Sequence, residues 1–208
     1  MSKVLLINGS PHVHGCTFTA LDVVAKELEQ NGVETEIVHV GHKDIRGCIG
    51  CFKCRELGQC VFDKDLVNEV AKKFEEADGL IIGSPVYYAG MNGTLKSFLD
   101  RLFFSASYDK RFKVGAAVVS ARRMGTTATL DQMNKYFLHG EMPVASSRYW
   151  NAVHGNTAEE VLKDEEGLQT MRVLGRNMAF LIRAIARERE VAGLPETEQQ
   201  RFLTNFIR

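Results

Sequence analysis

Short apolar runs alternate along the chain with longer segments whose apolar residues recur every three or four positions. The short runs, each typical of a buried strand, lie at residues 4–7, 33–40, 80–83 and 114–119, with a fifth expected within 142–153. The longer segments, each typical of an amphipathic helix, lie around residues 21–28, 67–74, 95–102, 130–137 and 174–185. Strand and helix alternate five times, so the sequence predicts an α/β fold, a three-layer sandwich around a five-stranded parallel sheet.

A chain of 208 residues fits one domain with an appended tail. We expect the domain to span residues 1–190 and the tail residues 191–208. The tail is polar and then turns apolar at Phe202, Leu203, Phe206 and Ile207, so we expect it to pack on its own domain or on a partner subunit. Together with Phe103-Phe104 and Tyr149-Trp150, this apolar surface predicts a homodimer or a tetramer.

The charges argue against several classes of partner. The 26 Lys and Arg residues balance 26 Asp and Glu residues, whereas general nucleic-acid or acidic-membrane binders usually carry a basic excess. No apolar run approaches the roughly 20 residues of a membrane span. The first residues also lack the features of a signal peptide. We therefore expect a cytoplasmic protein that binds neither nucleic acid nor membrane.

Ligands of open α/β sheets bind outside the carboxyl ends of the strands, and the loop at residues 8–17 follows the first strand there. Its small and hydroxyl residues leave N–H and O–H groups free to surround an anion at a helix N-terminus. The loop matches neither the dinucleotide nor the ATP phosphate motif, and it holds no lysine, so a single terminal phosphate fits best. The alternative is a structural turn in which Ser10 or Thr17 caps the helix.

Two further loops follow the third and fourth strands. Tyr87 and Tyr88 suit stacking on an aromatic ligand, although one of them could instead pack into the core while the other covers a helix end. Asn92 or Thr94 would cap the following helix. Arg122 and Arg123, in the loop at 120–127, could neutralise a negative ring or phosphate, or form a solvated basic pair.

Together, the three loops resemble the NADPH-dependent FMN reductase family, which has the flavodoxin-like fold. The matching segments are 9–11, 15–17, 83–88 and 93–101, and the resemblance covers roughly residues 3–185. His12 and Cys16 stand where the family commonly has Arg and Asn. The resemblance implies a flavin-dependent oxidoreductase that binds FMN, with NAD(P)H as a candidate co-substrate and no assigned catalytic residue. The implied FMN-binding residues are Ser10, Pro11, His12, Gly15, Cys16, Thr17, Phe18, Pro85, Val86, Tyr87, Tyr88, Met91, Asn92, Gly93, Ser120, Arg122, Arg123 and Gly125.

Four of the five cysteines, Cys48, Cys51, Cys54 and Cys60, fall in one short segment with the spacing C-x2-C-x2-C-x5-C. In a cytosolic chain such clustering suggests metal or redox chemistry before disulfides. The two short gaps let three thiolates surround one corner of an iron–sulfur cubane, whereas zinc sites usually separate two cysteine pairs by a longer stretch. Free thiols or disulfides are the alternative.

This segment resembles the cysteine motif of iron–sulfur flavoproteins, which share the same fold. The resemblance implies that a Cys-rich insertion at 47–62 holds a 4Fe-4S cluster on the four cysteines and passes electrons to FMN, across a subunit interface. Its redox partner would be a small molecule or a protein. Two alternatives are a cluster-free NAD(P)H-dependent flavin or quinone reductase and a non-catalytic electron carrier or redox sensor.

Overall fold

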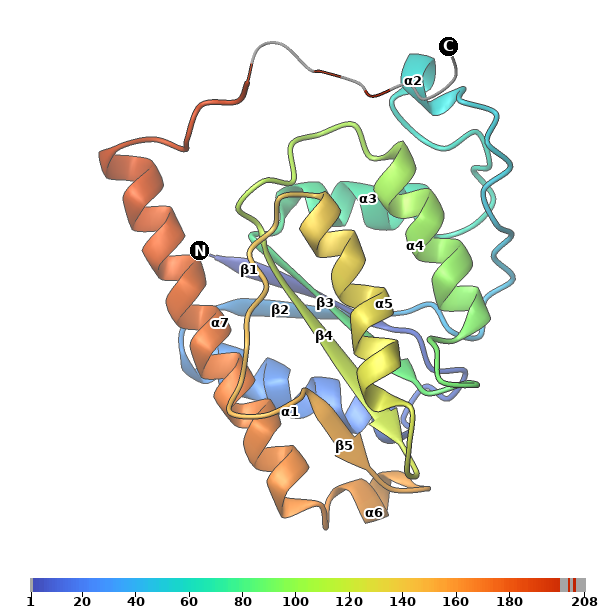
Figure 1. Cartoon of the computed structure of the whole chain (residues 1–208), viewed down its shortest axis with the longest axis vertical. Helices are drawn as coiled ribbons and strands as arrows, with labels where there is room; N and C mark the ends of the chain where they lie inside the picture. The colour runs from blue at the N-terminus through green and yellow to red at the C-terminus, as the bar shows by residue number, and fades with distance from the viewer. Residues whose placement is uncertain (1, 199–201, 203, 205–208) are drawn as a thin grey trace.

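A five-stranded, wholly parallel sheet forms the centre of the computed structural model, which describes residues 2–198, 202 and 204 (Figure 1). The strands, in chain order, are β1 (Lys3–Asn8), β2 (Glu34–His39), β3 (Gly79–Pro85), β4 (Val114–Ala121) and β5 (Ala152–His154). They lie side by side in the order β2-β1-β3-β4-β5. This is the strand order of the flavodoxin-like doubly wound sheet, so the predicted fold class is confirmed.

The described part of the chain contains seven helices, the last two of which follow the last strand. The seven are α1 (Cys16–Gln30), α2 (Cys54–Leu57), α3 (Val67–Glu76), α4 (Gly93–Ser105), α5 (Thr126–His139), α6 (Ala158–Val161) and α7 (Glu165–Val191). The five longer helices coincide with the predicted ones. The sequence pattern did not predict α2 and α6 because four residues are about one helical turn, too few to show a period.

The helices cover both faces of the sheet and create two cores. Successive side chains of a strand point to opposite faces, so Leu5 and Leu80 pack toward α3, α4 and α5, whereas Leu6 and Ile81 pack toward α1 and α7. Figure 1 shows α7 lying beside α1, away from α4 and α5. Strands buried on both faces need apolar residues at every position, which explains the continuous apolar runs.

The fifth strand is shorter than expected. Within the predicted region 142–153, Val144 forms one isolated bridge with Gly115, and β5 begins only at Ala152. Between them the chain is polar and leaves the sheet, and Tyr149 and Trp150 are exposed. The prediction of a strand there was therefore correct only at its end.

The C-terminal tail follows α7. Phe202 is exposed, while Leu203, Phe206 and Ile207 lie outside the described residues. The packing of the tail on the domain or on a partner stays a prediction.

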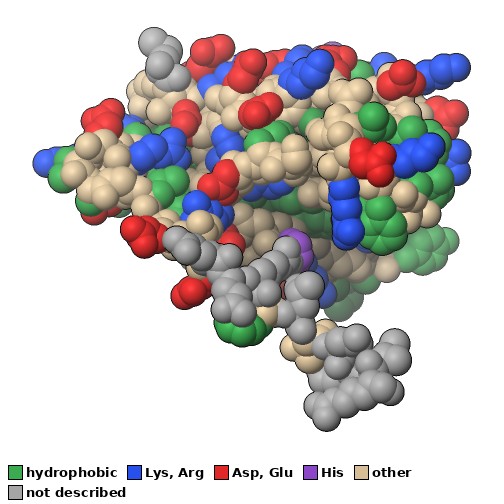
Figure 2. All heavy atoms as spheres, turned by 90° about the horizontal axis from the view of Figure 1, so that it is seen from above, with side chains coloured by type: hydrophobic (Ala, Val, Ile, Leu, Met, Phe, Trp, Pro, Cys, Tyr) green, Lys and Arg blue, Asp and Glu red, His purple; other side chains and the backbone are tan. Residues whose placement is uncertain are grey.

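The molecular surface carries charged side chains of both signs (Figure 2). Basic and acidic side chains lie interspersed over the face shown in Figure 2, as the balanced charge predicts. Among the described helices, none combines the length and apolar character needed to cross a membrane.

Candidate functional site

The carboxyl ends of β1, β3 and β4 meet at one edge of the sheet. Asn8 at the end of β1 pairs with Gly83, and Pro85 at the end of β3 pairs with Ser120 of β4. The three loops singled out in the sequence therefore lie at the same edge, where ligands of open α/β sheets bind.

The first loop is held from inside by Asn8, which is completely buried. Its Oδ1 accepts a hydrogen bond from the Ser10 amide at 3.0 Å, and its Nδ2 donates to the Val13 carbonyl at 3.1 Å. The Ser10 hydroxyl in turn accepts from the His12 amide at 3.1 Å. Asn8 thus shapes the loop that the sequence assigns to a phosphate.

The amides at the start of α1 are free to bind an anion. Gly15 is the N-cap and forms no side-chain cap, so neither Ser10 nor Thr17 caps the helix and that alternative is wrong. Thr17 instead shares a 2.8 Å hydrogen bond with the buried Ser120 hydroxyl, which joins the first loop to the third. The first backbone hydrogen bond of α1 runs from the Thr19 amide to the Gly15 carbonyl at 3.0 Å, so the Thr17 and Phe18 amides in the first turn precede it. Free donors at the positive end of a helix dipole favour a phosphate.

His39, the last residue of β2, also supports this loop. Its Nε2 lies 2.6 Å from the Ser10 carbonyl oxygen, so this nitrogen must donate, and its ring stacks on His42 with centroids 4.2 Å apart. Burial lowers the pKa of His39 and favours the neutral ring. Next to it, a Cβ on Gly41 would lie 2.2 Å from the carbonyl oxygens of Gly9 and Ser10, so only glycine permits this approach.

The second loop presents two tyrosines through a strained turn. Tyr87 and Gly90 exchange backbone hydrogen bonds of 2.8 and 2.9 Å. The two residues between them, Tyr88 and Ala89, have positive φ angles of 50° and 57°, a conformation rare outside glycine. Tyr88 is fully exposed and Tyr87 is 45% exposed, so neither ring packs into the core and that alternative is wrong. Such strain is typical of functional loops.

Buried polar groups at the base of the second loop fix its position. The Asn92 amide donates to the Ser84 hydroxyl at 3.0 Å, and the Asn92 side chain accepts from the Leu95 amide at 3.2 Å. Asn92 therefore caps α4, as predicted. The Met91 amide donates to Gln132 of α5 at 3.2 Å. Both Met91 and Asn92 are buried, and their hydrogen bonds hold the loop in place.

The third loop packs directly on the second. The Val86 amide donates to the Ser120 carbonyl at 3.0 Å. Gly125 has a positive φ of 94°, and a Cβ there would lie 2.9 Å from Val86 Cγ1. Arg122 and Arg123 are exposed at the tip of this loop, as a contact with an external ligand requires.

The remaining predicted flavin residues fall into two groups by exposure. Pro11, Phe18 and Pro85 are half-buried, while His12 and Gly93 are exposed.

Cys16 is half-buried, and burial raises the pKa of its thiol. Its Sγ lies 3.6 Å from the Gly155 carbonyl oxygen, so its side chain contacts protein.

The cysteine segment between β2 and α3 lies beside α4 (Figure 1). The four sequence-predicted ligands, Cys48, Cys51, Cys54 and Cys60, line one small cavity together with side chains of α4. Gly50 and Gly58 supply the turns through positive φ angles of 63° and 67°. Within the residues that the structure describes, no three His, Cys, Asp or Glu side chains are arranged to hold a single metal ion.

Arg101 of α4 contacts this segment and is completely buried. Its Nε lies 3.2 Å from Cys60 Sγ, and its guanidinium forms an ion pair with Asp65. The neighbouring Asp100 pairs with Lys96 on the surface, whereas Arg101 points inward.

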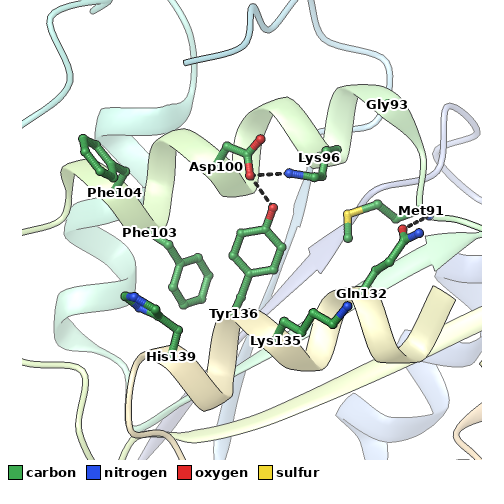
Figure 3. Close-up of a pocket in the computed structure, with 10 residues that line it drawn as sticks. All are labelled: Met91, Gly93, Lys96, Asp100, Phe103, Phe104, Gln132, Lys135, Tyr136 and His139. Carbon is green, nitrogen blue, oxygen red and sulfur yellow. Dashed lines mark hydrogen bonds and ion pairs between the residues drawn. The ribbon is translucent and has the colours of Figure 1, made fainter. Parts of the chain in front are cut away.

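A groove of about 700 Å³ between α4 and α5 connects the two regions (Figure 3). Met91 and Gly93 of the second loop lie at one end, and Phe104, which also lines the cysteine cavity, lies at the other. Inside it, the Tyr136 hydroxyl and Lys96 both lie 2.5 Å from Asp100 Oδ1. Burial, with the Asp100 hydrogen bond, raises the pKa of Tyr136 to about 12, so this hydroxyl stays protonated at neutral pH.

Known proteins resemble this chain in sequence and in fold. The family model of the NADPH-dependent FMN reductases matches residues 2–157. An iron-sulfur flavoprotein of Methanocaldococcus jannaschii is 35% identical over 193 residues, covering 89% of this chain and all of that protein.

Two solved structures share the fold at low sequence identity. RosB, determined with bound 8-demethyl-8-formylriboflavin-5'-phosphate, has a TM-score of 0.72 at 18% identity, covering 100% of this chain and 94% of that one. A flavodoxin from the domain Archaea has a TM-score of 0.59 at 15% identity, covering 88% of this chain and 99% of that one. With the sequence match, the chain belongs to the NADPH-dependent FMN reductase family and is a flavin-dependent oxidoreductase.

The lowered pKa of His39 predicts a pH dependence of stability. Below about pH 6.5, the usual pKa of an exposed histidine, the unfolded chain binds a proton that the folded loop does not. This contribution to the free energy of unfolding is therefore complete above about pH 6.5 and is lost as the pH falls toward the lower pKa of the folded state. The variant His39→Gln should lose this part of the dependence in urea unfolding between pH 7.5 and 5. Identical pH slopes for the variant and the wild type would contradict the assignment.

Proposed function

We propose that this flavin-dependent oxidoreductase binds FMN at the carboxyl edge of the sheet and a 4Fe-4S cluster in the cysteine segment. It passes electrons between a donor, the cluster and the flavin. NAD(P)H is a candidate hydride donor, and the other redox partner is a small molecule or a protein. The observation that carries the proposal is that four cysteines line one cavity at the far end of the helix that begins at the flavin loop.

The first loop supports the proposal that FMN binds here, because its N–H groups can donate hydrogen bonds to one phosphate. The Thr17 and Phe18 amides lie in the first turn of α1, and no lysine in the loop could serve a polyphosphate. The exposed rings of Tyr87 and Tyr88 lie on a loop at the same edge, where a flat ring system would have to lie. Bound flavin supplies the redox chemistry, and these residues bind and orient it.

The four cysteine thiolates and one buried hydroxyl support the proposal that a cluster binds in the cysteine cavity. Each thiolate of a cubane binds a different iron, so the four sulfurs need not converge on one point as they would around a single ion. Ser105 of α4 lines the same cavity, and its buried hydroxyl has no hydrogen-bond partner among the described residues. A buried hydroxyl normally has a partner, and a sulfur atom in the cavity would provide one.

We also propose a homodimer or tetramer in a reducing cytoplasm. Phe104, Tyr149 and Trp150 are each more than half exposed, and exposed aromatic side chains are enriched at interfaces. A second subunit could bring its own flavin close to the cysteine segment. A reducing compartment keeps the five cysteines as thiols, all of which are free in the structure.

Flavin identity is the first test. Protein reconstituted with a mixture of FMN and FAD should retain FMN at about one per chain, because the first loop provides for one phosphate. Mass spectrometry of the released flavin measures this. Stoichiometric FAD, or no retained flavin, would show that the phosphate assignment is wrong.

Cluster assembly is the second test. After anaerobic reconstitution with iron and sulfide, the wild type should hold about four irons per chain, matching one four-thiolate cluster. Single changes Cys48→Ala, Cys51→Ala, Cys54→Ala and Cys60→Ala should each prevent this, whereas the matched control Cys16→Ala, outside the cavity, should not. If the wild type holds no iron, or takes stoichiometric zinc, a cluster-free reductase replaces this proposal.

The subunit assembly is the third test. Light scattering of the micromolar protein should give the mass of two or four chains, because the exposed aromatic side chains would be covered. Replacement of Trp150 by Glu should shift the population toward the single chain. A wild-type protein that is monomeric at this concentration would refute the assembly.

A further inference from the structure

One face of α4 carries a row of polar residues toward the cysteine segment. Ser97, Arg101 and Ser105 recur every four residues and therefore lie one above another on the helix. Ser97 lies nearest Gly47 at the start of the segment, whereas Arg101 and Ser105 line the cysteine cavity itself. Two of these three polar residues, Arg101 and Ser105, therefore face the cysteines.

Arg101 joins both ends of the segment through one planar group. Its Nη1 donates to the Arg46 carbonyl at 3.3 Å, before the first cysteine, and its Nη2 donates to the Phe62 carbonyl at 2.9 Å, after the last. The ion pair with Asp65 neutralises the buried charge. The remaining donor, Nε, is directed at Cys60 Sγ at 3.2 Å. The guanidinium therefore holds the segment closed and also touches a cysteine sulfur.

Besides Arg101, Ser105 offers the cavity a second hydrogen-bond donor, its side-chain hydroxyl. Its side chain is 4% exposed and its Oγ forms no hydrogen bond within the described part of the chain. An unpaired buried hydroxyl destabilises a protein, unless a group in the cavity accepts its proton in a hydrogen bond. Sulfur atoms of a bound cluster are such acceptors.

We propose that Arg101 and Ser105 are positioning residues that orient the cluster and raise its reduction potential. The inference rests on the cluster assigned under the proposed function. One-electron reduction adds one negative charge to the cluster and breaks no bond, with the electron coming from reduced flavin or from added dithionite. Hydrogen bonds donated to sulfur stabilise the more negative form, so they favour the reduced cluster. Arg101 additionally fixes the loop before the cluster is bound.

The decisive variant is Ser105→Ala, which removes only the hydroxyl. It should fold as well as the wild type and hold the same iron, because no protein hydrogen bond is lost. The midpoint potential of the cluster, from an anaerobic dithionite titration followed by EPR, should fall. We expect about a tenfold smaller ratio of reduced to oxidised cluster at a given potential, which corresponds to about 59 mV for one electron. The matched control Ser97→Ala, on the same helix face but outside the cavity, should retain the wild-type potential.

Arg101→Lys tests the second donor and the loop. Lysine keeps the charge opposite Asp65 but cannot reach both carbonyls and the sulfur with one planar group. Limited proteolysis of the cluster-free variant should therefore cut within residues 47–62 faster than in the wild type, and the reconstituted variant should have a lower potential.

The outcomes separate the two proposals. If the wild type takes up no iron, the proposed function fails and the inference falls with it. If the wild type assembles a cluster but Ser105→Ala keeps the wild-type potential, only the inference is overturned. Should Arg101→Lys fail to fold, the comparison of Ser105→Ala with Ser97→Ala still decides.

Discussion

The N–H groups of a buried guanidinium cannot bind water, so they need hydrogen-bond acceptors inside the protein. The acceptors of Arg101 lie on the segment between β2 and α3. Burying an unpaired charge costs several kcal/mol, so α4 and this segment cannot separate without leaving both Arg101 and Asp65 unpaired. This segment, with its three positive-φ residues Gly50, Phe52 and Gly58, is thereby attached to α4. Phe62 packs against the guanidinium with its centroid 5.3 Å away, which completes the enclosure.

The same helix defines the position of the two candidate redox sites relative to each other. Asn92 caps α4 at the second loop, where we propose that the flavin binds, and Ser105 ends the helix at the cysteine cavity. At 1.5 Å per residue, Gly93 and Ser105 are about 18 Å apart along the axis. The groove between α4 and α5 is lined by residues from both ends of α4, Gly93 and Phe104 among them (Figure 3), and Phe104 also lines the cavity.

The sequence predicted the fold more completely than the site. Continuous apolar runs identify strands that are buried on both faces, and turn residues mark the loops at their carboxyl ends, so the sheet and the three loops could be predicted. The exposed Tyr88 and the cap Asn92 lie where the pattern placed them, and the four cysteines line one cavity, while the cluster itself stays a prediction. His39, Arg101 and Ser105 could not be assigned, since each acquires its role from a segment distant in sequence. The recurrence of Ser97, Arg101 and Ser105 at every fourth position of one helix was the one available signal.

The central claim is that flavin and cluster exchange electrons within one protein assembly. The most direct measurement is stopped-flow reduction of the anaerobic, reconstituted protein by NAD(P)H or by a photogenerated reductant, with flavin absorbance and rapid-freeze EPR of the cluster recorded together. We predict that the signal of the reduced cluster rises as reduced flavin is consumed, at a rate independent of protein concentration. A cluster that stays oxidised beside fully reduced flavin, or a rate that rises in proportion to protein concentration, would contradict the claim.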